Sequence, residues 1–172
     1  MTNDDLKRIT SILKPDLKYR HLGDRVGKDF QNSIEKGIPV AMKVFFAKED
    51  GVDAAFAVIA ISPLKMKQWE QIFIEEAWVK PGFKTGIASF ELMYLYVSED
   101  LRRKGLGSKL FAKVKNYAQK TGINSIYAYV GDIKDHALKF YLKEGAEVIS
   151  NFSEAGYTTA FLVWKNISKA NR

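Results

Sequence analysis

A basic loop with two glycines follows an apolar strand near the middle of the chain. It reads Arg102-Arg103-Lys104-Gly105-Leu106-Gly107-Ser108, and an amphipathic run follows it directly. Glycines let a backbone approach a ligand closely, and the start of a helix offers N–H groups and the positive end of its dipole. These features predict a binding site for an anion, most often a phosphate. A plain strand-to-helix turn with a solvated basic edge is the alternative interpretation.

Two common phosphate-binding patterns do not fit this loop. The Walker pattern fails because no glycine stands five residues before a Gly-Lys-Ser/Thr sequence. The dinucleotide-binding pattern fails because Leu110 occupies the position of its third glycine. What remains is Arg102-x-x-Gly105-x-Gly107 after a strand.

That remaining pattern resembles the pyrophosphate loop of the GNAT superfamily of N-acetyltransferases, which grip acetyl-coenzyme A. A second segment, from Ala137 to Ala146, resembles the other hallmark of this family, Ala-x-x-x-(Phe/Leu)-Tyr-x-Lys-x-Gly-Phe, with Ala146 in place of the final Phe. The two motifs occur in the family's order, separated by one helix and one strand. The resemblance covers about Ser89 to Val163, whereas the first 88 residues match in architecture only.

The resemblance implies a set of coenzyme contacts for acetyl-CoA as co-substrate, with no metal. The loop would hold the pyrophosphate through backbone N–H groups, and its three cationic side chains would add charge. In the family, the strand before the loop pairs its backbone with the pantetheine arm. The family often has Asn seven residues before the Tyr of the second motif, and Lys134 stands there in this chain. The implied coenzyme-binding residues are Leu95, Tyr96, Val97, Arg102, Arg103, Lys104, Gly105, Leu106, Gly107, Ser108 and Lys134.

Acetyl transfer to an amine also needs a base and an acid. An alkyl ammonium has a pKa near about 10.4 and must lose a proton before it attacks. Glu91 is the candidate base, because it lies eleven residues before Arg102, where the histone-acetylating branch of the family has a catalytic Glu. We expect partial burial to raise its pKa toward a useful value. The alternative is a carboxylate paired with a neighbouring Lys.

Tyr141 is the candidate acid that protonates the leaving thiolate. A phenol with a pKa near about 10 can protonate a thiolate of comparable basicity. The alternative is an aromatic core residue beside Phe140.

We expect Glu75 and Glu76, near the end of a helix predicted over residues 64–79, to attract a cationic acceptor at the substrate site. An ordinary amphipathic helix is the other interpretation there, and small amines, protein lysines and protein N-termini all stay open as acceptors.

Composition narrows the class of protein. The 172 residues are expected to form a single domain (1–172), with a net charge of +7 that favours anionic partners. The chain has no cysteine, which excludes disulfides, Cys-ligated metals and thiol catalysis. It has neither a long apolar run nor a secretory signal at its acidic start, so we expect a cytoplasmic location and no membrane partner. Whether the chain forms a homodimer stays open.

A coenzyme-binding regulatory module is the alternative function. A basic nucleic-acid-binding domain is disfavoured, because no nucleic-acid motif is recognisable.

The predicted elements describe an α/β (α+β mixed) fold. Strand, helix and strand in the middle of the chain imply a right-handed crossover between parallel strands, and hairpins at both ends add antiparallel strands. The resemblance implies a twisted mixed sheet of about six to seven strands flanked by helices. Strands are predicted at 40–48, 52–62, 88–97, 123–130, 146–152 and 157–164, and helices at 3–14, 24–36, 64–79, 104–120 and 134–144.

Overall fold

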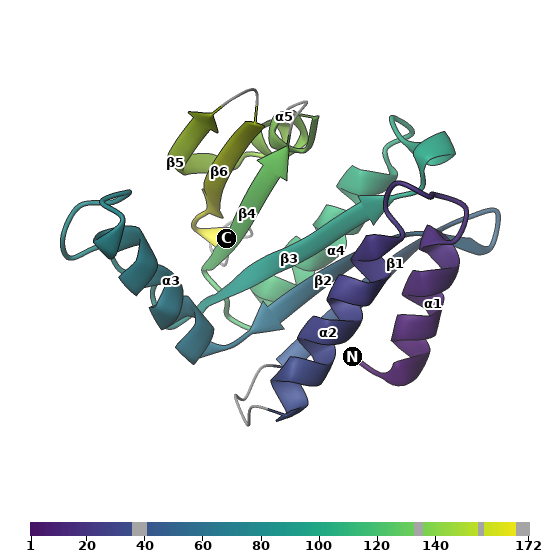
Figure 1. Cartoon of the computed structure of the whole chain (residues 1–172), viewed down its shortest axis with the longest axis horizontal. Helices are drawn as coiled ribbons and strands as arrows, with labels where there is room; N and C mark the ends of the chain where they lie inside the picture. Colours follow the sequence, from purple (N-terminus) through teal and green to yellow (C-terminus); the bar gives the residue numbers. More distant parts are fainter. Residues whose placement is uncertain (36–40, 133–135, 155–156, 168–172) are drawn as a thin grey trace. The chain divides into compact units, whose positions relative to one another are not determined.

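The computed structural model describes residues 1–35, 41–132, 136–154 and 157–167. Within them, six strands form one mixed sheet in the order β1-β2-β3-β4-β6-β5, flanked by five α-helices (Figure 1). The predicted α/β class and strand number are confirmed. The elements are α1 (Asn3–Leu13), α2 (His21–Glu35), β1 (Ala41–Glu49), β2 (Val52–Ile61), α3 (Pro63–Glu75), β3 (Ser89–Val97), the short 3-10 helix η1 (Glu99–Leu101), α4 (Leu106–Lys120), β4 (Ser125–Asp132), α5 (His136–Lys143), β5 (Glu147–Glu154) and β6 (Tyr157–Trp164).

The strand pairing has the predicted mixture of directions. β3 and β4 pair in parallel, with Ser89 opposite Ser125 and Leu92 opposite Ala128, and α4 connects them. β1–β2, β4–β6 and β5–β6 are antiparallel pairs. None of the helices in the described part of the chain has the length and apolar character needed to cross a membrane.

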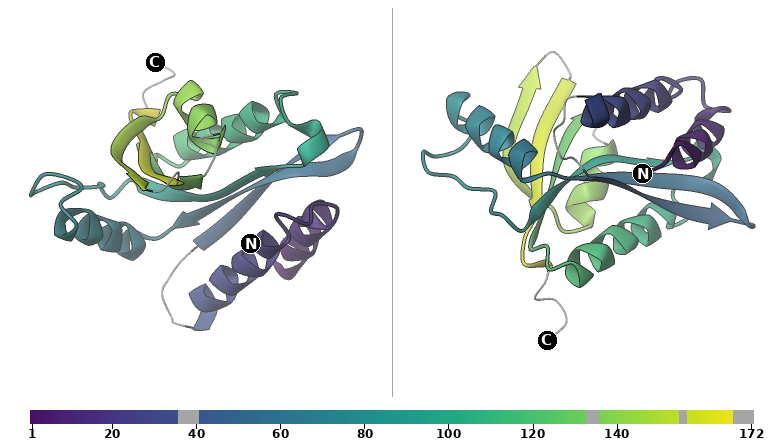
Figure 2. Two further views of the ribbon diagram at one scale, coloured as in Figure 1. Left: turned by 45° about the horizontal axis from the view of Figure 1, so that its top comes forward. Right: turned by 90° about the horizontal axis from the view of Figure 1, so that it is seen from below.

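The chain divides into two compact units. The first unit comprises Met1–Ser62 and Met93–Asn116, and the second comprises Pro63–Leu92 and Tyr117–Arg172. In the first unit, α1 and α2 cover one face of β1 and β2, and α4 lies on the other face (Figure 2). β2 is buried on both faces from Ala54 to Ala60, which agrees with its continuous apolar run.

Local sequence signals explain the start of the chain and its first hairpin. Asp50 and Gly51 both have positive φ (49° and 81°), the geometry of a tight turn between β1 and β2, so the predicted hairpin is confirmed. Thr2 is the N-cap of α1, because the Thr2 hydroxyl accepts from the Asp5 backbone N–H while the Asp5 carboxylate accepts from the Thr2 backbone N–H.

The second unit packs α3 on β4, β5 and β6. Met66 of α3 is buried with Tyr127 and Val163, and the ring of Phe161 lies 4.6 Å from that of Phe73. The helix buries only part of its apolar side chains. Phe73 is buried, but Leu64 and Ile72 are each 46% exposed.

The helix α3 also ends earlier than predicted, at Glu75 instead of Val79. Ala77 takes a positive φ of 56°, its N–H bonds to the Ile74 carbonyl, and the Trp78 N–H bonds to the Phe73 carbonyl. This is a Schellman termination, and the Trp78 ring packs on that of Phe73 (5.8 Å) as the accompanying apolar contact. The stop was missed because alanine occupies the position where glycine is usual.

Several other boundaries shift by a few residues. α2 begins at His21 instead of Asp24, and α4 begins at Leu106 instead of Lys104. β4 starts at Ser125 instead of Ile123. Lys134, predicted to begin α5 and to contact the coenzyme, lies outside the described residues.

Candidate active site

The basic loop is built by two residues in the left-handed backbone region. Arg103 has a φ of 65° and Gly105 a φ of 82°, and α4 begins at Leu106 because the Lys109 N–H bonds to the Gly105 carbonyl (3.0 Å). A helix could not start at Lys104 between these two conformations. As at the start of any α-helix, the N–H groups of the first turn point back toward the loop.

The exposed surface of the loop is formed by Arg103, Lys104 and Gly105. A Cβ added at Gly105 would meet no atom within 4 Å, so glycine is favoured there by its φ and not by crowding. Leu106 is 2% exposed and belongs to the core, so only its backbone could reach a ligand. The loop therefore combines two exposed cations with a helix start.

Arg102 has a different position from its two basic neighbours. Its Nε donates to the Val97 carbonyl (3.1 Å), one terminal nitrogen lies 3.5 Å from the Asp16 carboxylate, and the guanidinium lies over the Tyr19 ring (5.2 Å). The side chain is 37% exposed. Arg102 thus anchors the loop to its own unit, a role that the sequence did not reveal because Asp16 and Tyr19 are remote in the chain.

The end of β3 is held by the same contacts. The Tyr96 hydroxyl donates to Asp16 (2.7 Å), and burial, reinforced by this hydrogen bond, raises the pKa of Tyr96. Its ring stacks on Phe56 (5.6 Å) in the core. Of the three residues expected to face the pantetheine arm, Leu95, Tyr96 and Val97, Tyr96 has its side chain committed to packing, so only its backbone could serve.

Glu91, in the second unit, forms an ion pair with Lys65 of α3. The Lys65 Nζ lies 2.5 Å from the Glu91 Oε2, and the two side chains are 27% and 10% exposed. Pairing with a lysine was the alternative interpretation of Glu91 from the sequence. The partner was not foreseen, because nothing local links the first turn of α3 to the start of β3.

The sheet register shows what surrounds this pair. Glu91 is opposite Tyr127 of β4, which is opposite Val163 of β6, so the three side chains share the face covered by α3. The Tyr127 hydroxyl donates to the Thr85 carbonyl (3.2 Å). Burial, together with the charge of Glu70, raises the pKa of Tyr127 to about 12.

Tyr141 lies on the opposite face of the second unit's sheet. Its ring packs edge-on against Trp164 (5.4 Å), and Trp164 follows Val163, whose side chain points to the α3 face. Tyr141 is 8% exposed, and burial raises its pKa. The Tyr141 and Glu91 side chains therefore lie on opposite faces of this sheet, in which β3 and β4 pair from Ser89–Ser125 to Leu92–Ala128.

The second motif has a structural explanation at the end of α5. Gly145 has a φ of 90°, its N–H bonds to the Leu142 carbonyl, and the Ala146 N–H bonds to the Tyr141 carbonyl. This Schellman termination requires a residue that tolerates positive φ at position 145. The Tyr-x-Lys-x-Gly spacing thus fixes the last turn of α5 with Tyr141 facing the sheet.

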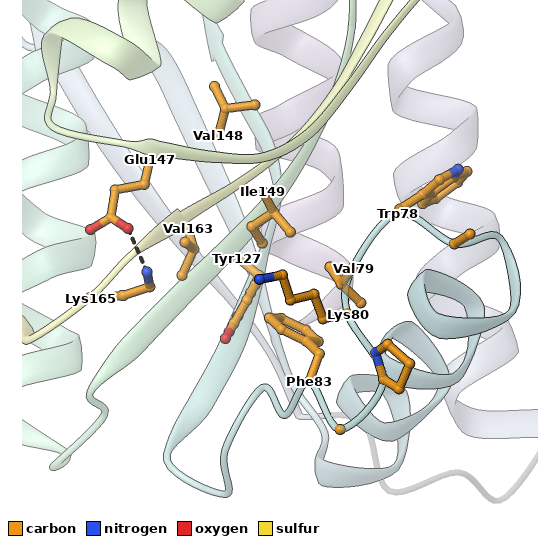
Figure 3. A pocket seen from close by; sticks show the side chains of 13 residues that line it. Trp78, Val79, Lys80, Phe83, Tyr127, Glu147, Val148, Ile149, Val163 and Lys165 are labelled. Atoms are coloured by element: carbon orange, nitrogen blue, oxygen red, sulfur yellow. Dashed lines mark hydrogen bonds and ion pairs between the residues drawn. The ribbon is translucent and has the colours of Figure 1, made fainter.

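A pocket of about 700 Å³ opens on the α3 face of the second unit. Figure 3 shows Tyr127 and Phe83 between the Glu147–Lys165 ion pair on one side and Trp78 on the other. Most of its lining is apolar or aromatic. Tyr127 is the register partner of Glu91, and neighbouring strands lie about 4.8 Å apart, so the pocket begins one strand away from the carboxylate.

The acidic residues of α3 divide into two groups. Glu70 accepts hydrogen bonds from the Thr85 backbone N–H (2.6 Å) and hydroxyl (2.7 Å), with Lys84 3.6 Å away. Burial alone would raise the pKa of Glu70, but these contacts outweigh it and the net shift is downward. Glu75 and Glu76 are exposed, and neither lines the pocket. No cluster of His, Asp and Glu side chains suited to a metal ion occurs within the described ranges.

A family model matches most of this chain. The model describes the acetyltransferase (GNAT) family, and the match extends over residues 6–146. The chain belongs to the GNAT acetyltransferase family. The matched range includes both sequence motifs and also α3.

Two curated relatives match parts of this GNAT chain. GCN5-related N-acetyltransferase 7, chloroplastic, from Arabidopsis thaliana is 31% identical over 90 residues, which are 52% of this chain and 33% of that protein. The tRNA(Met) cytidine acetyltransferase TmcA of Aeropyrum pernix is 25% identical over 104 residues, 60% of this chain and 14% of that protein. The chain therefore spans a third or less of the length of these relatives.

Solved structures share the GNAT fold along nearly the whole chain. A putative GNAT acetyltransferase from Desulfovibrio desulfuricans has a TM-score of 0.65 at 15% identity, covering 95% of this chain and 94% of that one. The PaiA N-acetyltransferase of Thermoplasma acidophilum, solved in complex with coenzyme A, has a TM-score of 0.57 at 14% identity, covering 96% and 95%. At these identities the likeness concerns the fold alone.

Proposed function

We propose that this chain transfers an acetyl group from acetyl-CoA to a primary amine. The observation that carries the proposal is the loop at the start of α4, where Arg103 and Gly105 turn the backbone and two cations are exposed. The family is one of acetyltransferases, and one structural neighbour was solved with coenzyme A. The acceptor class rests on the chemistry of Glu91 and its surroundings.

The residues of the loop fit a pyrophosphate. Space is open above Gly105, Arg103 and Lys104 present positive charge, and the first-turn N–H groups of α4 suit anionic oxygens. Arg102 has the supporting task of holding the loop on Val97 and Asp16. Leu95, Tyr96 and Val97 would offer backbone groups to the pantetheine arm, and Lys134 remains part of the proposed coenzyme contacts. When bound, acetyl-CoA supplies an acetyl group activated as a thioester.

Glu91 is proposed to accept the proton that the acceptor ammonium must lose. An ammonium beside a carboxylate favours the ionised carboxylate, which is the form that can act as a base. The Lys65 Nζ forms an ion pair with the Glu91 carboxylate, 2.5 Å from its Oε2. A substrate amine would approach Glu91 in the place that the Lys65 ammonium now takes.

Tyr141 is proposed to donate the proton that the leaving sulfur takes up. The phenol is protonated at neutral pH and can act as a donor. Burial raises its pKa, which makes it a weaker acid than an exposed tyrosine. Its side chain reaches the sheet from the face opposite Glu91. In this proposal Glu91 acts on the attacking nitrogen and Tyr141 on the departing sulfur.

The pocket beside Tyr127 is the proposed site for the body of the acceptor. Its lining, which includes Trp78, Phe83 and Val163, suits an apolar or aromatic portion next to the amine. Glu75 and Glu76 lie just before the pocket residue Ala77 in the chain and are exposed, so they would attract a cationic acceptor from solution without contacting it in the pocket.

Turnover of acetyl-CoA against a panel of amines tests the proposal. Release of the coenzyme thiol would be measured with small alkyl and aromatic amines, polyamines and peptides, each primary amine being matched by its N,N-dimethyl analogue. We expect thiol release with one or more primary amines and none with the matched tertiary amines, which have no proton to lose after attack. No thiol release with any amine, despite binding of the coenzyme, would refute the transfer reaction.

A coenzyme-binding module without turnover is the second candidate. The observation that favours it is the pairing of Glu91 with Lys65, since a carboxylate committed to a structural ion pair is a poorer base. The same assay separates the two functions, because the module predicts saturable binding of acetyl-CoA with no release of thiol.

A further inference from the structure

Lys65 brings a primary amine to the candidate base. Its Nζ lies 2.5 Å from the Glu91 Oε2, and its side chain is 27% exposed. The neighbouring Met66 is 2% exposed and packs on Tyr127, which fixes the first turn of α3 against the sheet. The lysine therefore presents, within the chain itself, the functional group that the proposed reaction acetylates.

A second lysine–glutamate pair in the same unit provides a contrast. Lys84 is 73% exposed, and its Nζ lies 3.6 Å from Glu70. The other oxygen of Glu70 accepts both hydrogen bonds from Thr85. Lys84 is thus a surface lysine near a carboxylate that has a structural task, whereas Lys65 is largely buried against Glu91.

We propose that Lys65 is an acceptor, and that the chain acetylates its own Lys65 side chain. This inference rests on the proposed function, since acetyl-CoA is the donor. The Lys65 ammonium gives one proton to Glu91, which passes it to solvent, and the neutral Nζ attacks the thioester carbonyl. A carbon–nitrogen bond forms, the carbon–sulfur bond breaks, and the second proton lost from Nζ balances the one that the departing thiolate takes up.

Proximity is the physical reason for selectivity. An amine held beside its base reacts as part of one molecule, which for well-aligned groups is worth many orders of magnitude in effective concentration. The acetylated product is a neutral amide, so the ion pair with Glu91 would be lost. The modification is therefore expected to leave Glu91 open to an amine from solution.

The test incubates the full chain with isotopically labelled acetyl-CoA and no added amine. Acetylation of each lysine is followed over time by mass spectrometry of peptides, with Lys84 as the matched comparison. We expect Lys65 to be modified more than about tenfold faster than Lys84, given the advantage of a positioned amine. The rate constant should not change on dilution of the protein, because the reaction is intramolecular. Glu91→Gln should reduce the rate at Lys65 to that at Lys84.

A second measurement needs no coenzyme. Trace labelling with acetic anhydride should modify Lys65 more slowly than Lys84, because the ion pair and burial protect its nitrogen, and Glu91→Gln should reduce that protection. The order of reactivity would thus reverse between the general reagent and acetyl-CoA.

Several results would overturn the inference. Equal acetylation of Lys65 and Lys84, a rate proportional to protein concentration, or no reversal of the reactivity order would each do so. If added amines are acetylated while Lys65 stays unmodified, the proposed function stands and the self-acetylation alone is refuted. If acetyl-CoA yields no acetylation anywhere, both are refuted.

Discussion

At its C-terminal end, β3 leads into an exposed basic loop, whereas near its start it carries Glu91, which is mostly buried. The loop consists of residues that follow one another, and its form depends on local φ values at Arg103 and Gly105. Glu91 instead depends on Lys65 from another element. A phosphate cradle can be built from consecutive backbone groups, but the state of a buried carboxylate is set by whichever charge the fold brings beside it.

The largest effect on turnover is expected from removing the Glu91 carboxylate. We expect Glu91→Gln to lower kcat for acetyl transfer by about 10²–10⁴-fold, the usual contribution of a general base, with little change in KM for acetyl-CoA. Thiol release under saturating coenzyme measures it. Glu70→Gln is the matched control, because Glu70 is also a carboxylate near a lysine and serves Thr85. Equal kcat in the wild type and Glu91→Gln would make the Lys65 pair purely structural.

Tyr141→Phe is expected to have the next largest effect. It keeps the ring against Trp164 but removes the hydroxyl, so kcat should fall by about a hundredfold with unchanged affinity for the coenzyme. Steady-state kinetics together with titration of coenzyme binding would separate the two quantities. Tyr129→Phe serves as control, since Tyr129 is 48% exposed and has no proposed role. A Tyr141→Phe enzyme of full activity would assign this residue to the core alone.

The loop can be tested with two glycines at opposite ends of α4. Gly105 (φ 82°) and Gly122 (φ 71°) both have open space around them, so alanine should cost a similar 1–2 kcal/mol, roughly, at each by backbone strain. Only Gly105→Ala should also raise the Kd for acetyl-CoA, by about tenfold, if distortion of the loop costs about 1.4 kcal/mol of binding. Equal coenzyme affinity in the two variants would contradict the cradle.

Glu70 allows a test of stability against pH. Its pKa is lowered in the folded chain, so its contribution is present above the unfolded pKa of about 4.3 and is lost as pH falls through the folded value. We expect Glu70→Gln to lower the free energy of unfolding by about 1–3 kcal/mol near pH 7, the range for hydrogen bonds to a charged group. Urea denaturation should show that difference shrinking toward pH 3. A difference that does not depend on pH would mean that the charge of Glu70 is irrelevant.

The smallest effect is expected at the exposed acids of α3. Reversing charge with Glu75→Lys and Glu76→Lys should raise KM for a cationic acceptor about two- to threefold at low salt, because long-range attraction is lost. The effect should disappear at high ionic strength and be absent for a neutral acceptor. A KM change that persists in high salt would indicate direct contact instead of attraction at a distance.

Structural features that depend on neighbouring residues could be predicted from the sequence, whereas contacts between remote segments could not. The β1–β2 hairpin and the loop before α4 follow from neighbouring residues, and they were predicted. The end of α3 was missed because Ala77 adopts the conformation that usually signals glycine. The ion pairs of Glu91 with Lys65 and of Arg102 with Asp16 could not be predicted, because each contact joins segments that only the fold brings together.

The most direct test of acetyl transfer to a primary amine measures both products of the reaction. The wild-type chain would be mixed with acetyl-CoA and the best primary amine, and the coenzyme thiol and the acetylated amine would be quantified together. Acetyl transfer predicts equal amounts of the two, with both reduced to the same extent in Glu91→Gln. Coenzyme that binds without yielding either product, or thiol released without an acetylated amine, would contradict it.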